Sequence, residues 1–184
     1  ELLETMKKED PTLEMLSAKD CIFRINRDVR FSKNKSPYKT NMGASINKGG
    51  RKAENSAGYY FHLEPGGVFT GGGIWMPMPD ELKKVRQEID YNFTDFKKII
   101  AAKKFKTVYG ELSSNPEYKL SRVPKGYDPE NPAAEFLKLK SYIAMIKISD
   151  ADLSSKDLVK KTVAAFEALQ PLIEFINEAL RAPE

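Results

Sequence analysis

The densest group of side chains that could do chemistry lies between residues 24 and 41. This segment, R-I-N-R-D-V-R-F-S-K-N-K-S-P-Y-K-T-N, carries three arginines at a spacing of three, then three lysines, and a single acidic residue. Guanidinium groups bind carboxylate or phosphate through paired hydrogen bonds, and lysine adds a mobile point charge. We therefore predict that the segment binds a small anionic or phosphate-containing ligand. Six of its residues are the candidates: Arg24, Arg27, Arg30, Lys35, Tyr38 and Lys39.

The same residues admit a structural interpretation. Arginines can pair with carboxylates and fix a loop to the domain while the lysines stay solvated. The acidic residues considered for such pairs are Asp28, Glu64, Asp80 and Glu88. Two hypotheses therefore stay open for this segment: a ligand site, or an ion-paired loop of a protein-interaction or scaffold domain that meets an acidic partner.

His62 is the only histidine, so a general base or nucleophile-activating histidine would have to be this residue. Because side chains alternate along a strand, Tyr60, His62 and Glu64 are predicted to share one face. A lone histidine on a strand is more often a packed residue, and that alternative stays open. If the protein is an enzyme, a tyrosine, a lysine or His62 as proton carrier would suit a hydrolase or transferase acting on a phosphate compound.

Two further candidates for the ligand site are Trp75 and Lys125. Trp75 follows three glycines at 71–73, and we group it with Tyr59 and His62 on neighbouring strands. Consecutive glycines in a strand mark a bulge or a close approach by a ligand or another backbone. The favoured interpretation is structural, a bulge that lets a helix or loop sit close to the sheet. Lys125 lies in V-P-K-G-Y-D, whose prolines and glycine fix a particular path. That loop either lines the site or straps one end of the sheet.

Several other classes are excluded. One histidine and one cysteine, Cys21, cannot build a zinc site of the usual kind, and we predict no metal and no cofactor. A single cysteine also excludes an intramolecular disulfide and fits a reducing compartment, so the predicted location is the cytoplasm. No apolar run approaches the ~18 residues of a membrane span, so no membrane partner is predicted. Because the chain starts at Glu1 and residues 1–8 resemble the middle of an amphipathic helix, we expect further helical residues upstream.

The positive charge is regional. The net charge is +4, whereas residues 24–52 contain nine Lys or Arg and one acidic residue, which leaves the rest of the chain at −4. A patch of one sign concentrates anions without specifying which anion. A nucleic-acid-binding module is an alternative, supported by aromatic residues among the cations, but the chain has no recognised motif and its overall charge is low for that role. The oligomeric state stays open.

The periodicity changes from strand-like to helix-like along the chain. Alternation and turn residues predict five strands, at 21–27, 42–47, 57–64, 68–76 and 142–148. Helical spacing predicts a helix pair after Asp80, a short helix near Asn131, and a long C-terminal helix kinked or restarted at Pro171. Short connections favour antiparallel pairing. We predict a single α+β domain over residues 1–184, with a mainly antiparallel sheet of about five strands and helices packed on one face.

Three blocks of the sequence resemble a known family. They are R-D-V-R-F-S-K-N-K-S-P-Y-K-T-N, then G-Y-Y-F-H-L-E-P-G-G-V-F-T-G-G-G-I-W-M-P, then V-P-K-G-Y-D-P-E-N-P. In this order they are similar to the signature blocks of a family of conserved hypothetical proteins of bacteria and fungi, a domain of unknown function. The resemblance implies a single α+β domain and supplies no activity, substrate or cofactor. Members of that family also carry an N-terminal helical segment with an N-N-x-x-W-F-like block, which this chain lacks.

Overall fold

An antiparallel sheet forms the centre of the structure. The structure is a computed structural model and describes residues 1–31, 33, 35–53 and 55–181. Four strands follow one another in the order β1-β2-β3-β4, each antiparallel to its neighbour. They span Met42–Ile46 (β1), Gly58–Leu63 (β2), Phe69–Ile74 (β3) and Tyr142–Lys147 (β4). The helical segment between residues 79 and 137 is therefore inserted between the last two strands.

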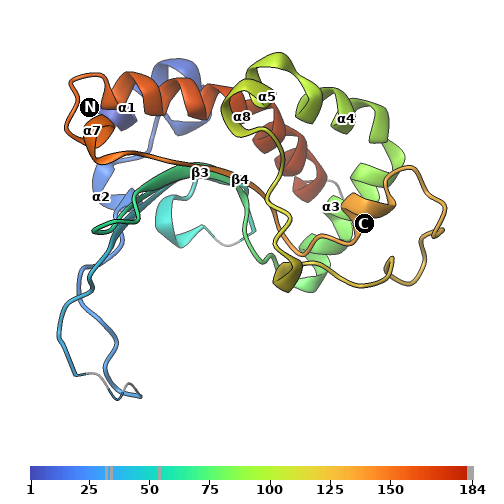
Figure 1. The fold of residues 1–184 in the computed structure, drawn as a ribbon, viewed down its shortest axis with the longest axis horizontal. Helices are drawn as coiled ribbons and strands as arrows, with labels where there is room; N and C mark the ends of the chain where they lie inside the picture. Colours follow the sequence, from blue (N-terminus) through green and yellow to red (C-terminus); the bar gives the residue numbers. More distant parts are fainter. Residues whose placement is uncertain (32, 34, 54, 182–184) are drawn as a thin grey trace.

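The longest helix, α8 (Leu158–Arg181), crosses one face of the sheet against β3. The other α-helices are α1 (Leu2–Glu9), α2 (Ala18–Cys21), α3 (Pro79–Tyr91), α4 (Phe93–Ala101), α5 (Lys103–Tyr109), α6 (Ala134–Leu137) and α7 (Asp150–Leu153). Short 3-10 turns are η1 (Pro11–Leu13), η2 (Gly50–Lys52) and η3 (Pro116–Tyr118). Figure 1 shows α1, α4, α5 and α8 on the same side of the sheet. Among the described residues, no helix is both long enough and apolar enough to cross a membrane.

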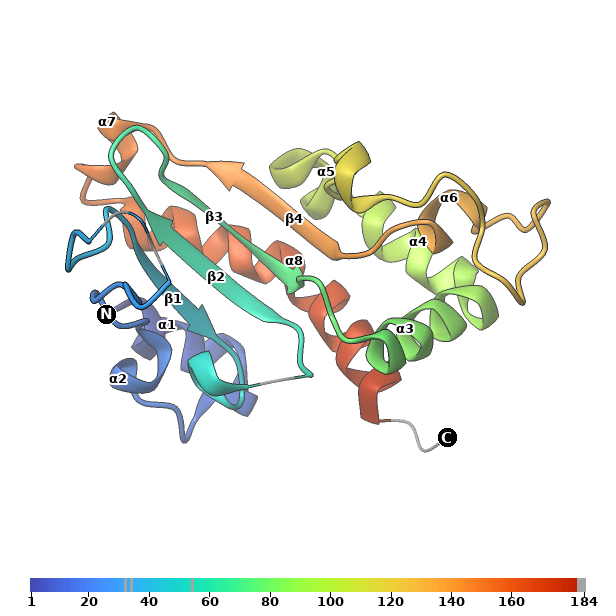
Figure 2. The same ribbon diagram turned by 90° about the horizontal axis from the view of Figure 1, so that it is seen from below.

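The hydrophobic core lies between the sheet and α8. Tyr59 of β2 and Tyr142 of β4 are almost fully buried, and the ring of Tyr59 lies 4.9 Å from that of Phe166 on α8. Because successive strand residues point to opposite faces, Tyr60 and His62 lie on the other face of β2. That second face is turned toward the viewer in Figure 2, with α8 behind the strands.

The α+β prediction, with helices on one face of an antiparallel sheet, is confirmed. Four of the five predicted strands are present, each within two residues of its predicted bounds. The long C-terminal helix is also present, but it continues through Pro171 and does not restart there.

The predicted strand at 21–27 is wrong, and the sheet has four strands. Cys21 is the last residue of α2, and beyond it only isolated bridges form, between Ile22 and Ala44 and between Asn26 and Tyr38. Alternation of apolar and polar residues indicates which side chains are shielded from water. It does not require that the segment form a continuous ladder of backbone hydrogen bonds with another strand. Here Cys21 is shielded by a helix end, while Ile25 is half exposed.

The described residues between 24 and 41 form a narrow arm that projects from the sheet, with its two limbs side by side (Figure 1). The limbs are held by few backbone hydrogen bonds, from Arg27 N–H to the Pro37 carbonyl and from Lys39 N–H to the Ile25 carbonyl. Pro37 has no N–H to return, so the ladder cannot continue past it. We call residues 24–26 and 38–41 the base of the arm and residues 27–37 its tip.

The three glycines of β3 allow close approach of neighbouring strands. A Cβ atom on Gly71 would lie 2.1 Å from the Ala144 carbonyl oxygen, and one on Gly72 would lie 2.4 Å from the Gly58 carbonyl oxygen. Gly73 adopts a φ of +116°, which L side chains rarely adopt. The register of β3 with both neighbours runs unbroken through the triplet. The glycine triplet thus contains no bulge, and the favoured bulge interpretation is wrong. The glycines instead allow the backbones of the neighbouring strands to approach closely.

Candidate functional site

Two of the predicted ligand residues converge at the base of the arm. Arg24 and Lys39, one from each limb, line a pocket of about 180 Å³. The other lining residues are Phe23, Asn41, Gly43 and Tyr60. Within the described part of the chain, neither Arg24 nor Lys39 has an ion-pair partner. Two cations without an ion-pair partner in the described residues therefore line the same small pocket.

The residues of the arm tip do not reach this pocket. Arg30 forms a two-pronged ion pair with Asp28, with Nη2 to Oδ2 at 2.6 Å and Nε to Oδ1 at 3.0 Å. The hydrogen bonds from Arg30 hold the pKa of Asp28 below its ordinary value. Lys35 donates to the Val29 carbonyl at 2.9 Å. For Arg30, the structure thus favours the ion-pair interpretation.

The other arm candidates differ in how they are placed. Arg27, at the start of the tip, is half-buried, and its backbone N–H donates to the Pro37 carbonyl. Tyr38, at the base, is 58% exposed and does not line the pocket. Ser32 and Asn34, which belong to the first family block, lie outside the described residues.

Trp75 and Lys125 lie far from the arm. Trp75 follows the end of β3, whereas the arm leaves the sheet beside the start of β3, where Phe69 pairs with His62. The Trp75 ring packs edge-on against Tyr118 at 4.8 Å. Lys125 is exposed on the loop between η3 and α6, which lies at the opposite end of the molecule in Figure 2. The fold therefore does not bring these two residues into one cleft with Arg24 and Lys39.

A hydrogen-bonded chain runs along β2 from the pocket. Tyr60 Oη lies 3.1 Å from His62 Nδ1, and His62 Nε2 lies 3.3 Å from Glu64 Oε2. The second carboxylate oxygen, Glu64 Oε1, accepts a hydrogen bond from Thr40 Oγ1 of the arm at 3.2 Å. The three β2 side chains meet because they occupy alternate positions on one face of the strand.

For a neutral imidazole, the chain has one self-consistent direction. If the Tyr60 hydroxyl donates to Nδ1, the neutral imidazole carries its proton on Nε2 and donates to the Glu64 carboxylate. Burial raises the pKa of Tyr60, so its phenol is protonated at neutral pH and can act as that donor. The Phe69 ring stacks on His62 at 4.5 Å and Phe23 packs edge-on against Tyr60, which fixes both rings.

This arrangement is suited to moving a proton beside a bound anion. Tyr60 lines the same pocket as Arg24 and Lys39. A phenol that is hydrogen-bonded to an imidazole, which is in turn oriented by a carboxylate, can release and recover a proton during a reaction. Gly43 leaves room for the phenol, because a Cβ atom there would lie 2.6 Å from Tyr60 Oη.

Sequence reasoning missed Tyr60 as a site residue and placed Tyr59 there instead. Tyr59 points into the core, and its hydroxyl donates to Asp10 Oδ2 at 3.1 Å. The alternation that places Tyr60, His62 and Glu64 on one face was the available signal. The sequence could not show which face of β2 is covered by α8, and this decides which tyrosine is accessible.

Taken together, the fold and this site define a small α+β domain with a basic arm and a Tyr-His-Glu chain at the base of that arm. The chain belongs to the conserved hypothetical protein family DUF2461, whose sequence model matches residues 1–175. The resemblance seen in the sequence is thereby confirmed. No curated protein and no solved structure matches the chain.

Proposed function

We propose that the protein binds a small phosphate-containing anion at the base of the arm and acts on it as a hydrolase or transferase. The observation that carries this proposal is the convergence of two unpaired cations, Arg24 and Lys39, with Tyr60 on one pocket. The Arg24 guanidinium supplies a planar pair of donors to two phosphate oxygens, and the Lys39 ammonium supplies a point charge to a third.

The proposed reaction needs a proton at the leaving oxygen. As the P–O bond of a phosphate monoester breaks, Tyr60 donates its proton to the departing alkoxide, and the cations stabilise the charge on the phosphoryl oxygens. The nucleophile is water in a hydrolase or an acceptor hydroxyl in a transferase. Its proton is lost to the Tyr60 oxygen, which restores the phenol. Between the two transfers, Arg24 and Lys39, which line the same pocket, stabilise the phenolate charge.

Binding is tested by thermal unfolding with inorganic phosphate, phosphate monoesters, nucleotides and short oligonucleotides. A ligand at about 100 times its Kd stabilises the folded state by about 2.7 kcal/mol. We expect one small phosphate compound to stabilise the parent, and the Arg24→Gln, Lys39→Gln double variant to fold but lose this response. The matched control is Arg30→Gln, a charge removed from the same arm outside the pocket.

Three outcomes would contradict the binding proposal. The first is that no phosphate compound stabilises the parent. The second is that Arg30→Gln loses the response as completely as the double variant. The third is that only oligonucleotides stabilise the protein, with a steep loss of affinity in salt, which would favour the nucleic-acid alternative.

Catalysis is tested by the choice of leaving group. Tyr60→Phe should slow hydrolysis of an alkyl phosphate such as glycerol phosphate by about 10²- to 10⁴-fold, the usual contribution of a general acid or base. Hydrolysis of p-nitrophenyl phosphate should change much less, because nitrophenolate leaves without a proton. Equal slowing of both substrates would show that Tyr60 is not the proton donor.

A further inference from the structure

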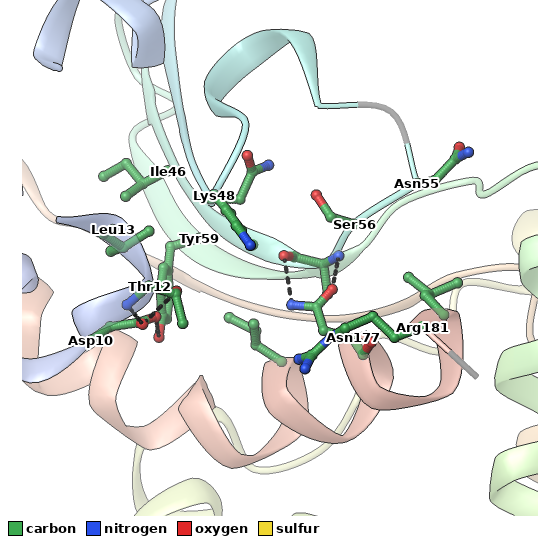
Figure 3. A pocket seen from close by; sticks show the side chains of 15 residues that line it. Asp10, Thr12, Leu13, Ile46, Lys48, Asn55, Ser56, Tyr59, Asn177 and Arg181 are labelled. Atoms are coloured by element: carbon green, nitrogen blue, oxygen red, sulfur yellow. Dashed lines mark hydrogen bonds between the residues drawn. The ribbon is translucent and has the colours of Figure 1, made fainter. Parts of the chain in front are cut away.

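We propose a second binding site, for a small organic monocarboxylate with an apolar body, between α8 and the ends of β1 and β2. A pocket of about 330 Å³ lies there and is shown in Figure 3. This volume is within the range of small-molecule sites in proteins. The pocket is separate from the site at the base of the arm, since Ile46 and Lys48 line it from the other end of β1.

Two cations reach into this pocket from different elements. Lys48 extends toward it from just beyond β1, and Arg181 extends toward it from the last turn of α8 (Figure 3). Arg181 Nε donates to the Asn177 carbonyl at 3.1 Å, which leaves its terminal nitrogens for a ligand. In the described ranges of the chain, no carboxylate pairs with either cation. Two separate donors can therefore take the two oxygens of one carboxylate.

The one acidic side chain in the wall, Asp10, is already engaged. Its Oδ1 accepts from Thr12 N–H at 3.0 Å and from Thr12 Oγ1 at 2.6 Å, and its Oδ2 accepts from Tyr59 Oη at 3.1 Å. Its charge nevertheless belongs to the pocket wall, so the charged side chains that line the pocket, Asp10, Lys48 and Arg181, sum to +1. A monoanion matches this charge better than a phosphate dianion does, because the second negative charge would lack a partner.

The remaining wall suits an apolar body. Leu13 of η1, Ile46 of β1 and both Ile173 and Leu180 of α8 line the pocket beside the polar groups. Burying an alkyl chain against them is favourable in proportion to the apolar area removed from water. A carboxylate at one end and a hydrocarbon at the other would thus satisfy both parts of the pocket.

The pocket is rigidly framed on one side. The Asn177 side chain is hydrogen-bonded to Ala57 in both directions: its Oδ1 accepts from Ala57 N–H at 2.9 Å and its Nδ2 donates to the Ala57 carbonyl at 3.2 Å. This pair ties α8 to the start of β2. The neighbouring Ser56 hydroxyl is buried without a hydrogen-bond partner in the residues the structure describes. A rotation of its side chain would offer a further donor to a ligand in the pocket.

The test uses octanoate as the probe, with octan-1-ol, octylamine and acetate as matched compounds. Binding is followed by titration with backbone amide NMR, and we expect octanoate to shift the resonances of Ala57 and Asn177. Lys48→Gln and Arg181→Gln should each weaken octanoate binding about tenfold, as expected for loss of one charge-assisted hydrogen bond. Lys52→Gln, an exposed charge on η2 outside the pocket, should leave the affinity unchanged. The amide spectra also report whether each variant is folded.

The proposal is overturned by any of three results. Octan-1-ol or octylamine could bind as tightly as octanoate, which would show that the carboxylate is not recognised. The folded Lys48→Gln, Arg181→Gln double variant could keep the parent affinity. Octanoate could also shift only residues at the base of the arm and lose affinity in the Arg24→Gln, Lys39→Gln variant, which would place its binding there.

Discussion

Gly71 has no room for a side chain, and this makes it a sensitive residue for the stability of the sheet. A Cβ atom at Gly71 would lie 2.1 Å from the Ala144 carbonyl oxygen and 2.8 Å from Met145 Cα, and both are backbone atoms of β4 that cannot rotate away. We expect Gly71→Ala to lower the free energy of unfolding by more than about 3 kcal/mol, because the β3–β4 ladder must separate to admit the methyl group. Urea denaturation at neutral pH measures the difference.

Gly67 provides the matched control for the same substitution. It lies in the turn between β2 and β3, and a Cβ atom there would make only ordinary contacts, the nearest being Glu64 Oε2 at 3.8 Å. We expect Gly67→Ala to change the free energy of unfolding by less than about 1 kcal/mol. A small effect of Gly71→Ala, similar to that of the control, would show that the strands are not held as close together as the structure has them.

At the level of secondary-structure elements, Glu135 of α6 joins two segments. Its Oε2 lies 2.8 Å from the Lys119 ammonium just after η3, and its Oε1 lies 2.6 Å from the Lys138 ammonium. These hydrogen bonds, from Lys119 first and then Lys138, hold the pKa of Glu135 at about 2, compared with an ordinary value of 4.5. The carboxylate therefore stays charged in the folded protein at pH values where the unfolded chain is already protonated.

The lowered pKa of Glu135 sets the direction of a pH effect. The folded pKa lies below the unfolded one, so the stabilisation by Glu135 is present in full above about pH 4.5 and is lost as pH falls toward about 2. We expect Glu135→Gln to reduce the pH dependence of the free energy of unfolding within that window, as followed by urea denaturation at a series of pH values. The control is Glu111→Gln, since Glu111 has no ion-pair partner in the part of the chain that is described. An unchanged slope for Glu135→Gln would mean that the two lysines do not hold the carboxylate in solution.

Most of the strands that local patterns predict have partners close in the chain, although β4, whose partner β3 is distant, was predicted as well. The strands β1, β2 and β3 follow from alternation and turn residues, because each pairs with a neighbour across a short connection. The expected strand at 21–27 fails because alternation cannot say what a segment pairs with. The separation of Trp75 from Arg24 was likewise beyond local reasoning. It follows from the antiparallel order, which places the start of β1, where the arm leaves the sheet, near the start of β3. Trp75 follows the other end of β3.

At the scale of the whole molecule, the arm projects from the body and its two ends are distinguishable. The tip, residues 27–37, carries Arg30 and Phe31, both exposed, and the Asn26–Tyr38 bridge closes the limbs below it. Replacing the tip by Asn-Gly keeps that bridge and joins the limbs by a two-residue hairpin turn. We expect the shortened protein to keep its free energy of unfolding within about 1 kcal/mol, because none of the described residues of the tip belongs to the core.

The shortened arm separates the base pocket from the tip as the place where the phosphate compound binds. Arg24, Lys39 and Tyr60 all remain, so we expect the stabilisation by a phosphate compound to persist in thermal unfolding. At 0.15 M salt the Debye length is about 8 Å, so loss of the tip's exposed charges should have little effect on the pocket. Adding Arg24→Gln and Lys39→Gln to the shortened protein should then abolish the response. If removal of the tip alone abolishes the stabilisation by the phosphate compound while the fold persists, the ligand is bound by Arg27, Arg30 or Lys35. The base of the arm would then only connect those residues to the sheet.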